Sequence, residues 1–288
     1  MSLTCIIDYL NIRLPTLHPR AHLRQQAGYR LYRGRLTAEV AGFVLTPYQV
    51  PVVHAATGEL FAQRGRLWVR TRDGLPVTLE TLYVQAWNAE DAVYLDRFLR
   101  TFQALNHLHQ GHEAQKPLVL DVHLRHVAAI PVRHGAVFEA LLDLLGLRPT
   151  QMVLRLDGRA LHDDVHVQKA ARSFAGHGYH LLAAQQDIAD TDWDLLGSLG
   201  VRWVSPHHRY LEAWPSRRPW GRWRQSKTGR IGLWFDGIDS PQAFRRARAL
   251  GADLIEGDLV FPARFQAPSW SNLEDAQLGV GGHGSIDH

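Results

Sequence analysis

Arginine side chains surround a short apolar run in the stretch RGRLWVR, residues 64–70. The run Leu67–Arg70 predicts a strand, and Arg64 and Arg66 lie where that strand begins. A guanidinium group donates hydrogen bonds and accepts none, so it binds carboxylate or phosphate groups and cannot ligate a metal ion. The chemistry expected of this stretch is therefore anion binding or ion pairing.

A second group of cations lies in residues 212–230, EAWPSRRPWGRWRQSKTGR, where an amphipathic helix would be expected. Aromatic residues among cations are typical of a surface that binds a protein or a nucleic acid. Alternatively, the tryptophans pack on the rest of the fold and the arginines stay solvated. No recognised nucleic-acid module accompanies the segment, so we do not expect nucleic acid as a partner. The candidate partner surface comprises Trp214, Arg217, Arg218, Trp220, Arg222, Trp223 and Arg224.

The composition is that of a soluble globular protein, with 288 residues, 45% hydrophobic and 21% charged. A single cysteine, Cys5, excludes an internal disulfide framework and a CxxC zinc site. The N-terminal residues lack the features of a signal peptide, and no segment has the roughly 20 apolar residues that span a bilayer. We therefore expect a cytoplasmic protein without membrane contact. The net charge of +4 permits anionic partners without requiring them.

Apolar runs alternate with helical patterns along most of the chain. Since the runs are rich in Val, Leu and Ile, they predict strands that are covered on both faces. Eight such strands separated by helices indicate a (β/α)8 barrel, and a doubly wound sheet fits the periodicity nearly as well. The expected strands are Gly42–Leu45, Leu67–Arg70, Leu118–Leu124, Met152–Leu156, His180–Ala184, Arg202–Val204, Ile231–Phe235 and Leu254–Ile255.

Helix boundaries can be read from capping residues and apolar stripes. Asn88 is expected to cap a helix, and Ser240 followed by Pro241 to begin the last one, which Gly251 ends. Two further helices are predicted by apolar stripes at helical spacing, Phe138, Leu141, Leu142 and Leu145 in one and Val167, Ala170, Ala171 and Phe174 in the other.

Six blocks of sequence follow one another along the chain: PVVHAATGELFAQRGRLWVRTRDG, LVLDVHLRHV, LLGLRPTQMVLRLDGRAL, GYHLLAAQQD, VRWVSPHHRYL and IGLWFDGIDSPQAFRRARALGADLIEGDLVFPA. In order and spacing they resemble those of EAL domains, the bacterial cyclic di-GMP phosphodiesterases. The resemblance covers residues 36–268 and implies a modified TIM barrel with one antiparallel strand. It leaves residues 1–35 as an N-terminal extension and residues 269–288 as a flexible, glycine-rich tail.

The resemblance implies a site at the carboxyl ends of the strands, where oxygen ligands hold two divalent cations and a water. At the aligned positions this chain departs from that pattern. Arg64 replaces the Glu of Glu-Ala-Leu, Arg155 replaces the first Glu of Glu-Ile-Thr-Glu, and only Asp236 keeps a carboxylate. The other altered positions are Arg66 for Leu, Trp68 for Arg, His123 for Asn, Ala184 and Gln185 for two Asp, Ser205 and His207 for Lys and Asp, and Glu256 for Gln.

Two interpretations of the arginines remain open. Arg64 and Arg155 build an anion pocket, or they pair with carboxylates and fill the former site with salt bridges. We favour the second, because a decayed site most simply collapses on its own charges. The carboxylates available for pairing are Asp157, Asp236 and Glu256.

His123, His207 and Asp236 would all lie at strand ends on one face of the barrel. Imidazole suits zinc or nickel, so a new transition-metal site is one interpretation. In a chain with 17 histidines we favour unrelated placement. We therefore expect no metal and no other cofactor.

These departures predict a catalytically inactive EAL-like regulatory protein of bacterial signalling that acts through protein–protein contacts. We do not expect it to bind cyclic di-GMP firmly, and the identity of its protein partner stays open, as does a homodimer. One alternative is a metal-independent receptor for cyclic di-GMP or another nucleotide that uses Arg64, Arg66 and Arg155. The other is residual cyclic di-GMP phosphodiesterase activity.

Overall fold

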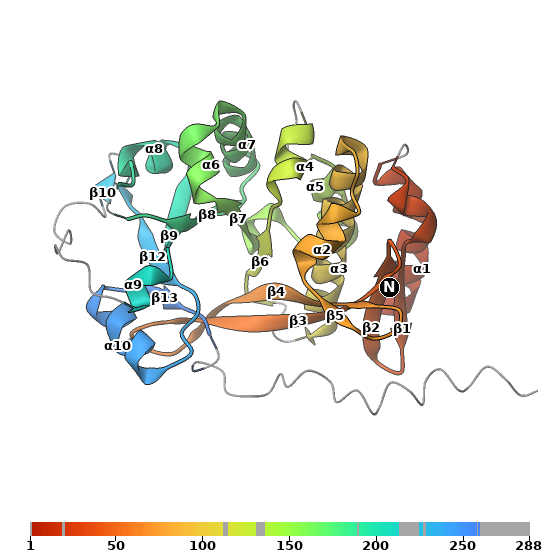
Figure 1. Ribbon diagram of the computed structural model, residues 1–288, viewed down its shortest axis with the longest axis horizontal. Coiled ribbons are helices and arrows are strands. Elements are labelled where there is room, and N and C mark those ends of the chain that lie inside the picture. Colours follow the sequence, from red (N-terminus) through yellow and green to blue (C-terminus); the bar gives the residue numbers. More distant parts are fainter. Residues whose placement is uncertain are drawn as a thin grey trace, which may run out of the picture.

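Eight strands close into a barrel in which one strand runs against the others (Figure 1). Parallel ladders join β4, β6, β7, β8, β9, β12 and β13 in that order, and β3 pairs antiparallel with both β13 and β4. This topology confirms the expected modified TIM barrel. The computed structural model describes residues 2–18, 21–111, 115–130, 136–188, 190–212, 225–226, 229–257 and 259.

Each of the eight expected strands falls in one strand of the barrel. The barrel strands are β3 (Phe43–His54), β4 (Leu60–Thr71), β6 (Leu118–Asp121), β7 (Met152–Asp157), β8 (His180–Gln186), β9 (Val201–Pro206), β12 (Gly232–Phe235) and β13 (Leu254–Ile255). The prediction was wrong about the ends of several of them, most of all β3, β4 and β6.

The hairpin of β3 and β4 is much longer than its apolar runs indicated. Its two strands of 12 residues pair from Phe43 opposite Thr71 to Val53 opposite Leu60. Backbone hydrogen bonding along this hairpin extends both strands through polar positions. Arg64 and Arg66 therefore lie inside β4 and not at its beginning.

Helices cover the barrel between the strands, and Asn88 and Ser240 cap α3 and α10 as expected. No helix among the described residues is long and apolar enough to cross a membrane. The helices are α2 (Leu79–Val84), α3 (Ala89–His109), α4 (Leu124–Ala129), α5 (Ala136–Leu144), α6 (Gly158–Asp163), α7 (Val165–Gly176), α8 (Trp193–Ser198), α9 (Arg209–Glu212) and α10 (Pro241–Ala249). Short pieces complete the described chain: the 3-10 turn η4 (Pro149–Gln151) and the strands β5 (Pro76–Val77), β10 (Gln225–Ser226) and β11 (Gly229–Arg230).

The barrel interior begins with an apolar layer that the strands contribute together. Side chains alternate between the two faces of a strand, so one residue from each strand points inward at a given level. The layer consists of Val52, Ala62, Val119, Val153, Leu182, Trp234 and Leu254, with Phe61 and Trp203 packed against it. It provides the floor on which the polar end of the barrel is built.

The N-terminal residues form a unit that packs on one end of the molecule, opposite α10 (Figure 1). It comprises α1 (Leu3–Arg13), the turns η1 (Leu14–Thr16) and η2 (Leu23–Gln26), and the hairpin of β1 (Gly28–Tyr32) and β2 (Arg35–Val40), which continues the sheet beyond β3. Asn11 Nδ2 donates to the Tyr29 carbonyl at 2.9 Å, and Asn11 Oδ1 accepts from the Tyr29 amide at 2.8 Å. The Asn11 side chain therefore pairs the backbone groups of Tyr29 at the outer edge of β1. Ile7 and Leu10 are buried in the main core.

Burial on α1 predicts that this helix contributes to the stability of the whole chain. Leu10 is 2% exposed and Ile12 is 77% exposed on the same helix. Leu10→Ala should lower the free energy of unfolding by about 3 kcal/mol, because it leaves a cavity in the core. Ile12→Ala, the matched control, should change it by less than about 0.5 kcal/mol. Urea unfolding of both variants measures the difference, and equal stabilities would show that α1 does not dock on the barrel.

Candidate functional site

A second interior layer lies one step above the apolar floor, at the carboxyl ends of the parallel strands. Because side chains alternate along a strand, each member of this layer follows a residue of the floor by two positions. Asp121 thus follows Val119 on β6, and Arg155 follows Val153 on β7. The layer consists of Arg64, Asp121, Arg155, Ala184, Ser205, Asp236 and Glu256.

Arg64 is the centre of this layer. Its side chain is buried, 4% exposed, and both terminal nitrogens reach carboxylates. Nη1 donates to Glu256 and lies 3.7 Å from Asp236, while Nη2 donates to both oxygens of Asp121 at 3.2 Å. One guanidinium group therefore contacts three acidic side chains that come from three different strands or their ends.

Arg155 completes the arrangement from the neighbouring strand. Its Nη1 donates to Asp121 at 3.2 Å and its Nη2 donates to Asp236 at 2.7 Å. Two guanidinium groups and three carboxylates thus form one connected group, called here the charged cluster: Arg64, Asp121, Arg155, Asp236 and Glu256. The prediction that the arginines pair with Asp236 and Glu256 is confirmed.

Charge interactions in the cluster outweigh the effect of burial. Burial alone lowers the pKa of Arg64, but Asp121, Glu256 and Asp236 raise it above the ordinary value. Burial raises the pKa of Asp121, yet the guanidinium groups of Arg64 and Arg155 lower it to about 2. The pKa shifts of Arg64 and Asp121 therefore both favour the charged form of the side chain.

The charged cluster does not fit a pair of divalent cations. Mg²⁺ and Mn²⁺ need several oxygen ligands around one point, and here guanidinium nitrogens occupy the space between the carboxylates. No group of three or more His, Cys, Asp or Glu side chains within the described part of the chain is arranged to hold a metal ion. The oxygens that would ligate a metal already accept hydrogen bonds from arginine.

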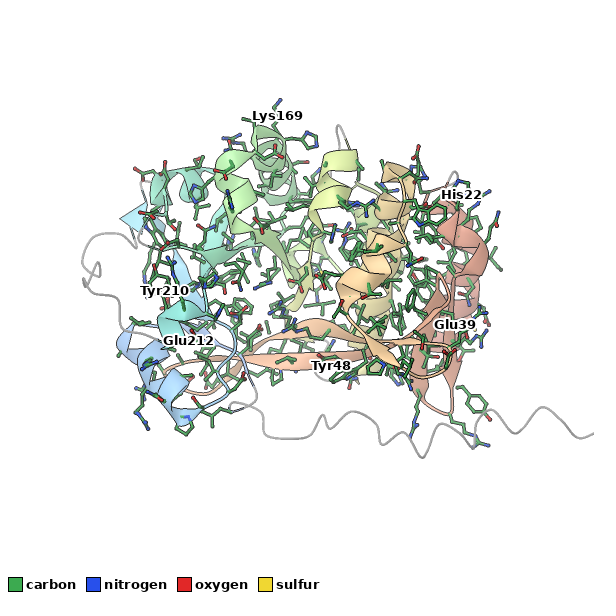
Figure 2. All side chains as sticks on the ribbon, in the orientation of Figure 1. His22, Glu39, Tyr48, Lys169, Tyr210 and Glu212 are labelled. Carbon is green, nitrogen blue, oxygen red and sulfur yellow. The ribbon has the colours of Figure 1, made fainter. Side chains whose placement is uncertain are left out.

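A cavity of about 520 Å³ opens beside the cluster. Arg64, Asp121 and Arg155 line one side of it, and Arg66 and Tyr48 line another; Tyr48 projects from the middle of β3 (Figure 2). Arg66 is exposed and forms no salt bridge with any described residue. The cavity thus offers one exposed guanidinium group next to a cluster in which three carboxylates face two guanidinium groups.

Buried charges on α3 support the wall of this cavity. Arg100 and Asp96 form an ion pair one turn apart, and Arg100 Nη2 lies 3.1 Å from Nε2 of His126. A guanidinium group only donates, so Nε2 must accept and the imidazole proton lies on Nδ1, 3.3 Å from Asp96. Burial raises the pKa of Asp96, but Arg100 and His126 lower it below the ordinary value. These groups pair their charges with one another and belong to the architecture of the wall.

Two residues expected near the site, His123 and Asp157, line the cavity, and the side chain of each caps a helix. The strand β6 was predicted to continue to Leu124, but it ends at Asp121. His123 lies beyond this end, and its side chain caps α4 by accepting from the Arg125 amide. Its ring stacks on Tyr83 with centroids 3.8 Å apart. Asp157 was one of three carboxylates available for pairing with the arginines, and its side chain instead caps α6 by accepting from the Ala160 amide at 2.8 Å.

The other altered positions divide between the cavity and its surroundings. Ala184 and Gln185 line the cavity, and Gln185 has a left-handed backbone with φ of 56°, which is a strained conformation at a strand end. Trp68 stacks on Tyr48 at 5.0 Å. Ser205 is buried in the second layer, and the His207 side chain accepts from the Arg209 amide. His123, His207 and Asp236 do not assemble into a common site.

Asp121 is the member of the cluster that the sequence analysis missed. The sequence analysis aligned the Asn of the Asn-x-Ser block with His123 in LVLDVHLRHV, and the side chain that reaches the cluster is Asp121, two residues earlier. Val119 and Asp121 lie two positions apart on an apolar strand, so their side chains share one face. This spacing was the signal that could have identified Asp121 as a residue of the barrel interior. The candidate partner surface from Trp214 to Arg224 lies outside the described residues, and so does the tail 269–288.

Comparison with known proteins identifies the fold. No family model and no curated protein matches the sequence. Among solved structures, the EAL domain of FimX from Pseudomonas aeruginosa bound to cyclic di-GMP has a TM-score of 0.60 at 14% identity, covering 74% of this chain and 88% of its own. The calcium and cyclic di-GMP complex of Klebsiella pneumoniae BlrP1 has a TM-score of 0.59 at 14% identity, covering 80% and 59%.

The EAL enzyme Bd1971 in its cAMP-bound form gives the same result. Its TM-score is 0.58 at 12% identity, and the match covers 75% of this chain and 62% of that enzyme. This chain therefore spans less than two thirds of the length of Bd1971. The barrel has the fold of EAL domains, as the resemblance of the six sequence blocks implied.

Removal of Arg64 should be far more damaging than removal of Arg66 two positions away on the same strand. Arg64→Met leaves Glu256 buried without its cation, so the free energy of unfolding should fall by about 3–5 kcal/mol. Arg66→Met, the exposed control, should change it by less than about 0.5 kcal/mol.

The double variant Arg64→Met/Glu256→Met should recover most of the loss, because both buried charges are then removed. Urea unfolding of the native chain, Arg64→Met, Glu256→Met and the double variant closes the cycle, with Arg66→Met as the exposed control. Equal stability of Arg64→Met and Arg66→Met would refute the buried ion pair.

Acid should weaken the folded state through Asp121. Its pKa is about 2 in the folded chain and ordinarily 3.8, so its contribution is complete above about pH 4 and is lost as the pH falls towards 2. The free energy of unfolding of the native chain should fall through this window, and Asp121→Asn should show a shallower slope there. Identical slopes would mean that Asp121 is not ionised next to the arginines.

Proposed function

We propose that this chain is a regulatory protein of bacterial cyclic di-GMP signalling whose barrel performs no metal-dependent hydrolysis and which acts by contacting another protein. The observation that carries the proposal is the charged cluster, in which Arg64 and Arg155 bind the carboxylates at the carboxyl end of the barrel. The EAL folds of FimX and BlrP1, both described in complex with cyclic di-GMP, support the assignment to this signalling system.

Electrostatics supports the loss of the metal-dependent reaction. Two unit charges 4 Å apart repel each other by about 4 kcal/mol at an effective dielectric constant of 20, and a divalent cation doubles that value. A metal ion at this end of the barrel would face two guanidinium groups, and it would have to break their bonds to Asp121, Asp236 and Glu256. Without a metal ion, no described group stands in for the cation that polarises the phosphodiester and activates the water.

The packed barrel floor and outer helices support action through a protein partner. The barrel floor and the outer helices are intact, so the domain keeps a defined surface while its former site is filled. The Trp/Arg segment of residues 212–230 remains a predicted partner surface. A homodimer remains a second form of protein contact that the proposal accommodates.

A metal-independent nucleotide receptor is the second candidate function, and the exposed Arg66 beside the 520 Å³ cavity is the observation that favours it. This candidate also needs Arg64 and Arg155, but both guanidinium groups donate their hydrogen bonds to carboxylates. Calorimetric titration of cyclic di-GMP in chelator should therefore give no binding. Binding that is abolished by Arg66→Glu would replace the first proposal with this one.

The chain should not hydrolyse phosphodiesters in the presence of Mn²⁺. Purified protein incubated with cyclic di-GMP, and separately with bis(p-nitrophenyl) phosphate, should give the same rate as buffer containing Mn²⁺ alone. Asp236→Ala provides the control for contamination, because a contaminating enzyme is insensitive to this substitution. Hydrolysis that requires Mn²⁺ and disappears in Asp236→Ala would contradict the proposal and establish residual phosphodiesterase activity.

A further inference from the structure

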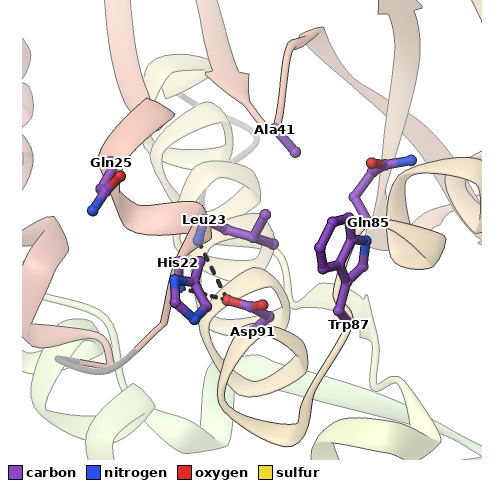
Figure 3. Close-up of a pocket in the computed structure, with 7 residues that line it drawn as sticks. All are labelled: His22, Leu23, Gln25, Ala41, Gln85, Trp87 and Asp91. Atoms are coloured by element: carbon purple, nitrogen blue, oxygen red, sulfur yellow. Dashed lines mark hydrogen bonds between the residues drawn. The ribbon is translucent and has the colours of Figure 1, made fainter.

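A second pocket lies where the N-terminal unit meets the barrel, and no part of the charged cluster lines it. Its volume is about 430 Å³ (Figure 3). Segments far apart in the sequence contribute its walls: η2 and the residue before it, the turn between β2 and β3, and the residues that lead into α3. The lining residues are His22, Leu23, Gln25, Ala41, Gln85, Trp87 and Asp91.

Asp91 places a carboxylate at a fixed position in this pocket. The residue is 2% exposed and lies in the first turn of α3. Its Oδ1 accepts from the backbone amides of His22 at 2.7 Å and Leu23 at 3.3 Å. The second oxygen, Oδ2, accepts no hydrogen bond from any residue that the structure describes. A buried carboxylate with one uncommitted oxygen favours a donor from outside the chain.

Trp87 provides an aromatic wall next to this carboxylate (Figure 3). Its side chain is 86% exposed, the most exposed of the large hydrophobic residues described. An indole that is solvated in the free protein and lines a pocket is typical of a contact residue, since tryptophan is enriched where binding energy is concentrated. The face of an indole also attracts cations.

Three further polar side chains, those of His22, Gln25 and Gln85, line the pocket. The side-chain amides of Gln25 and Gln85 make no hydrogen bond to any described residue, so their oxygens are available. The partial positive charge at the start of α3 does not oppose a cation here, because Glu90 and Asp91 in the first turn carry two full negative charges. The pocket thus combines a carboxylate, an indole and amide oxygens.

We propose that this pocket binds the side chain of an arginine presented by a protein partner. A guanidinium group is flat and carries five donors, so it can stack on Trp87 while it donates to Asp91 and an amide oxygen. A lysine ammonium group would satisfy the charge without the stacking plane. The choice of a protein as the partner rests on the proposed function. The pocket itself does not, since it shares no residue with the charged cluster.

The test uses a short capped peptide with a single arginine and the same peptide with citrulline, which keeps the shape and loses the charge. Binding to the full chain is followed by NMR through the ¹⁵N-labelled indole groups, with the Trp87 signal assigned by its loss in Trp87→Ala. The arginine peptide should shift the Trp87 signal in a saturable way, and the citrulline peptide should not.

Two variants separate binding from folding. Asp91→Asn keeps an oxygen that accepts from the His22 and Leu23 amides but removes the charge, so it should weaken binding by about tenfold or more while the chain stays folded. Trp87→Ala, read by calorimetry, should weaken it roughly fivefold. Glu59→Gln, which removes an exposed carboxylate elsewhere, should leave binding unchanged.

Equal binding of the citrulline peptide, or undiminished binding by Asp91→Asn, would overturn the proposal. Methylguanidinium that binds as tightly as the arginine peptide would overturn the assignment to a protein partner, because the rest of the peptide would then contribute nothing. Failure in this experiment leaves the absence of Mn²⁺-dependent hydrolysis standing, so the two proposals can fail separately.

Discussion

The ion pairing of one buried guanidinium group determines the character of this barrel. Arg64 lies among Glu256, Asp121 and Asp236 at the end of the strands. Three carboxylates so close together in a barrel interior would repel one another, and each would cost several kcal/mol if left unpaired. Arg64 and its neighbour Arg155 balance two of these three charges from within the chain. The barrel therefore carries most of the counter-charge in its own side chains.

The ion pairs of Arg64 and Arg155 lie above the apolar floor, so the packing of the fold and the chemistry of the upper layer depend on different residues. The apolar floor beneath the cluster and the helices around it depend on hydrophobic packing, which does not require the residues of the upper layer to be ligands. The architecture can therefore persist whether or not the upper layer holds metal ligands. The proposed recognition pocket of Trp87 and Asp91 lies away from the cluster, where the N-terminal unit docks on α3.

The sequence was sufficient for features governed by local periodicity. All eight barrel strands and the caps at Asn88 and Ser240 follow from spacing alone. The extent of the β3–β4 hairpin was not predictable, because backbone pairing carries these strands through polar residues. Asp121 was missed since its inward direction depends on the phase of a four-residue strand. The second pocket has no local signal, because tertiary contact alone brings η2 next to Trp87 and Asp91.

Titration of Mn²⁺ into the full chain tests the central claim most directly, since the claim is that guanidinium groups occupy the place of metal ions. Calorimetry, with electron paramagnetic resonance of unbound Mn²⁺ as a second measure, reports binding whether or not any reaction follows. The account predicts no saturable binding in the native chain and no difference between it and Asp236→Asn. Saturable binding of one or two Mn²⁺ ions that Asp236→Asn abolishes would contradict it.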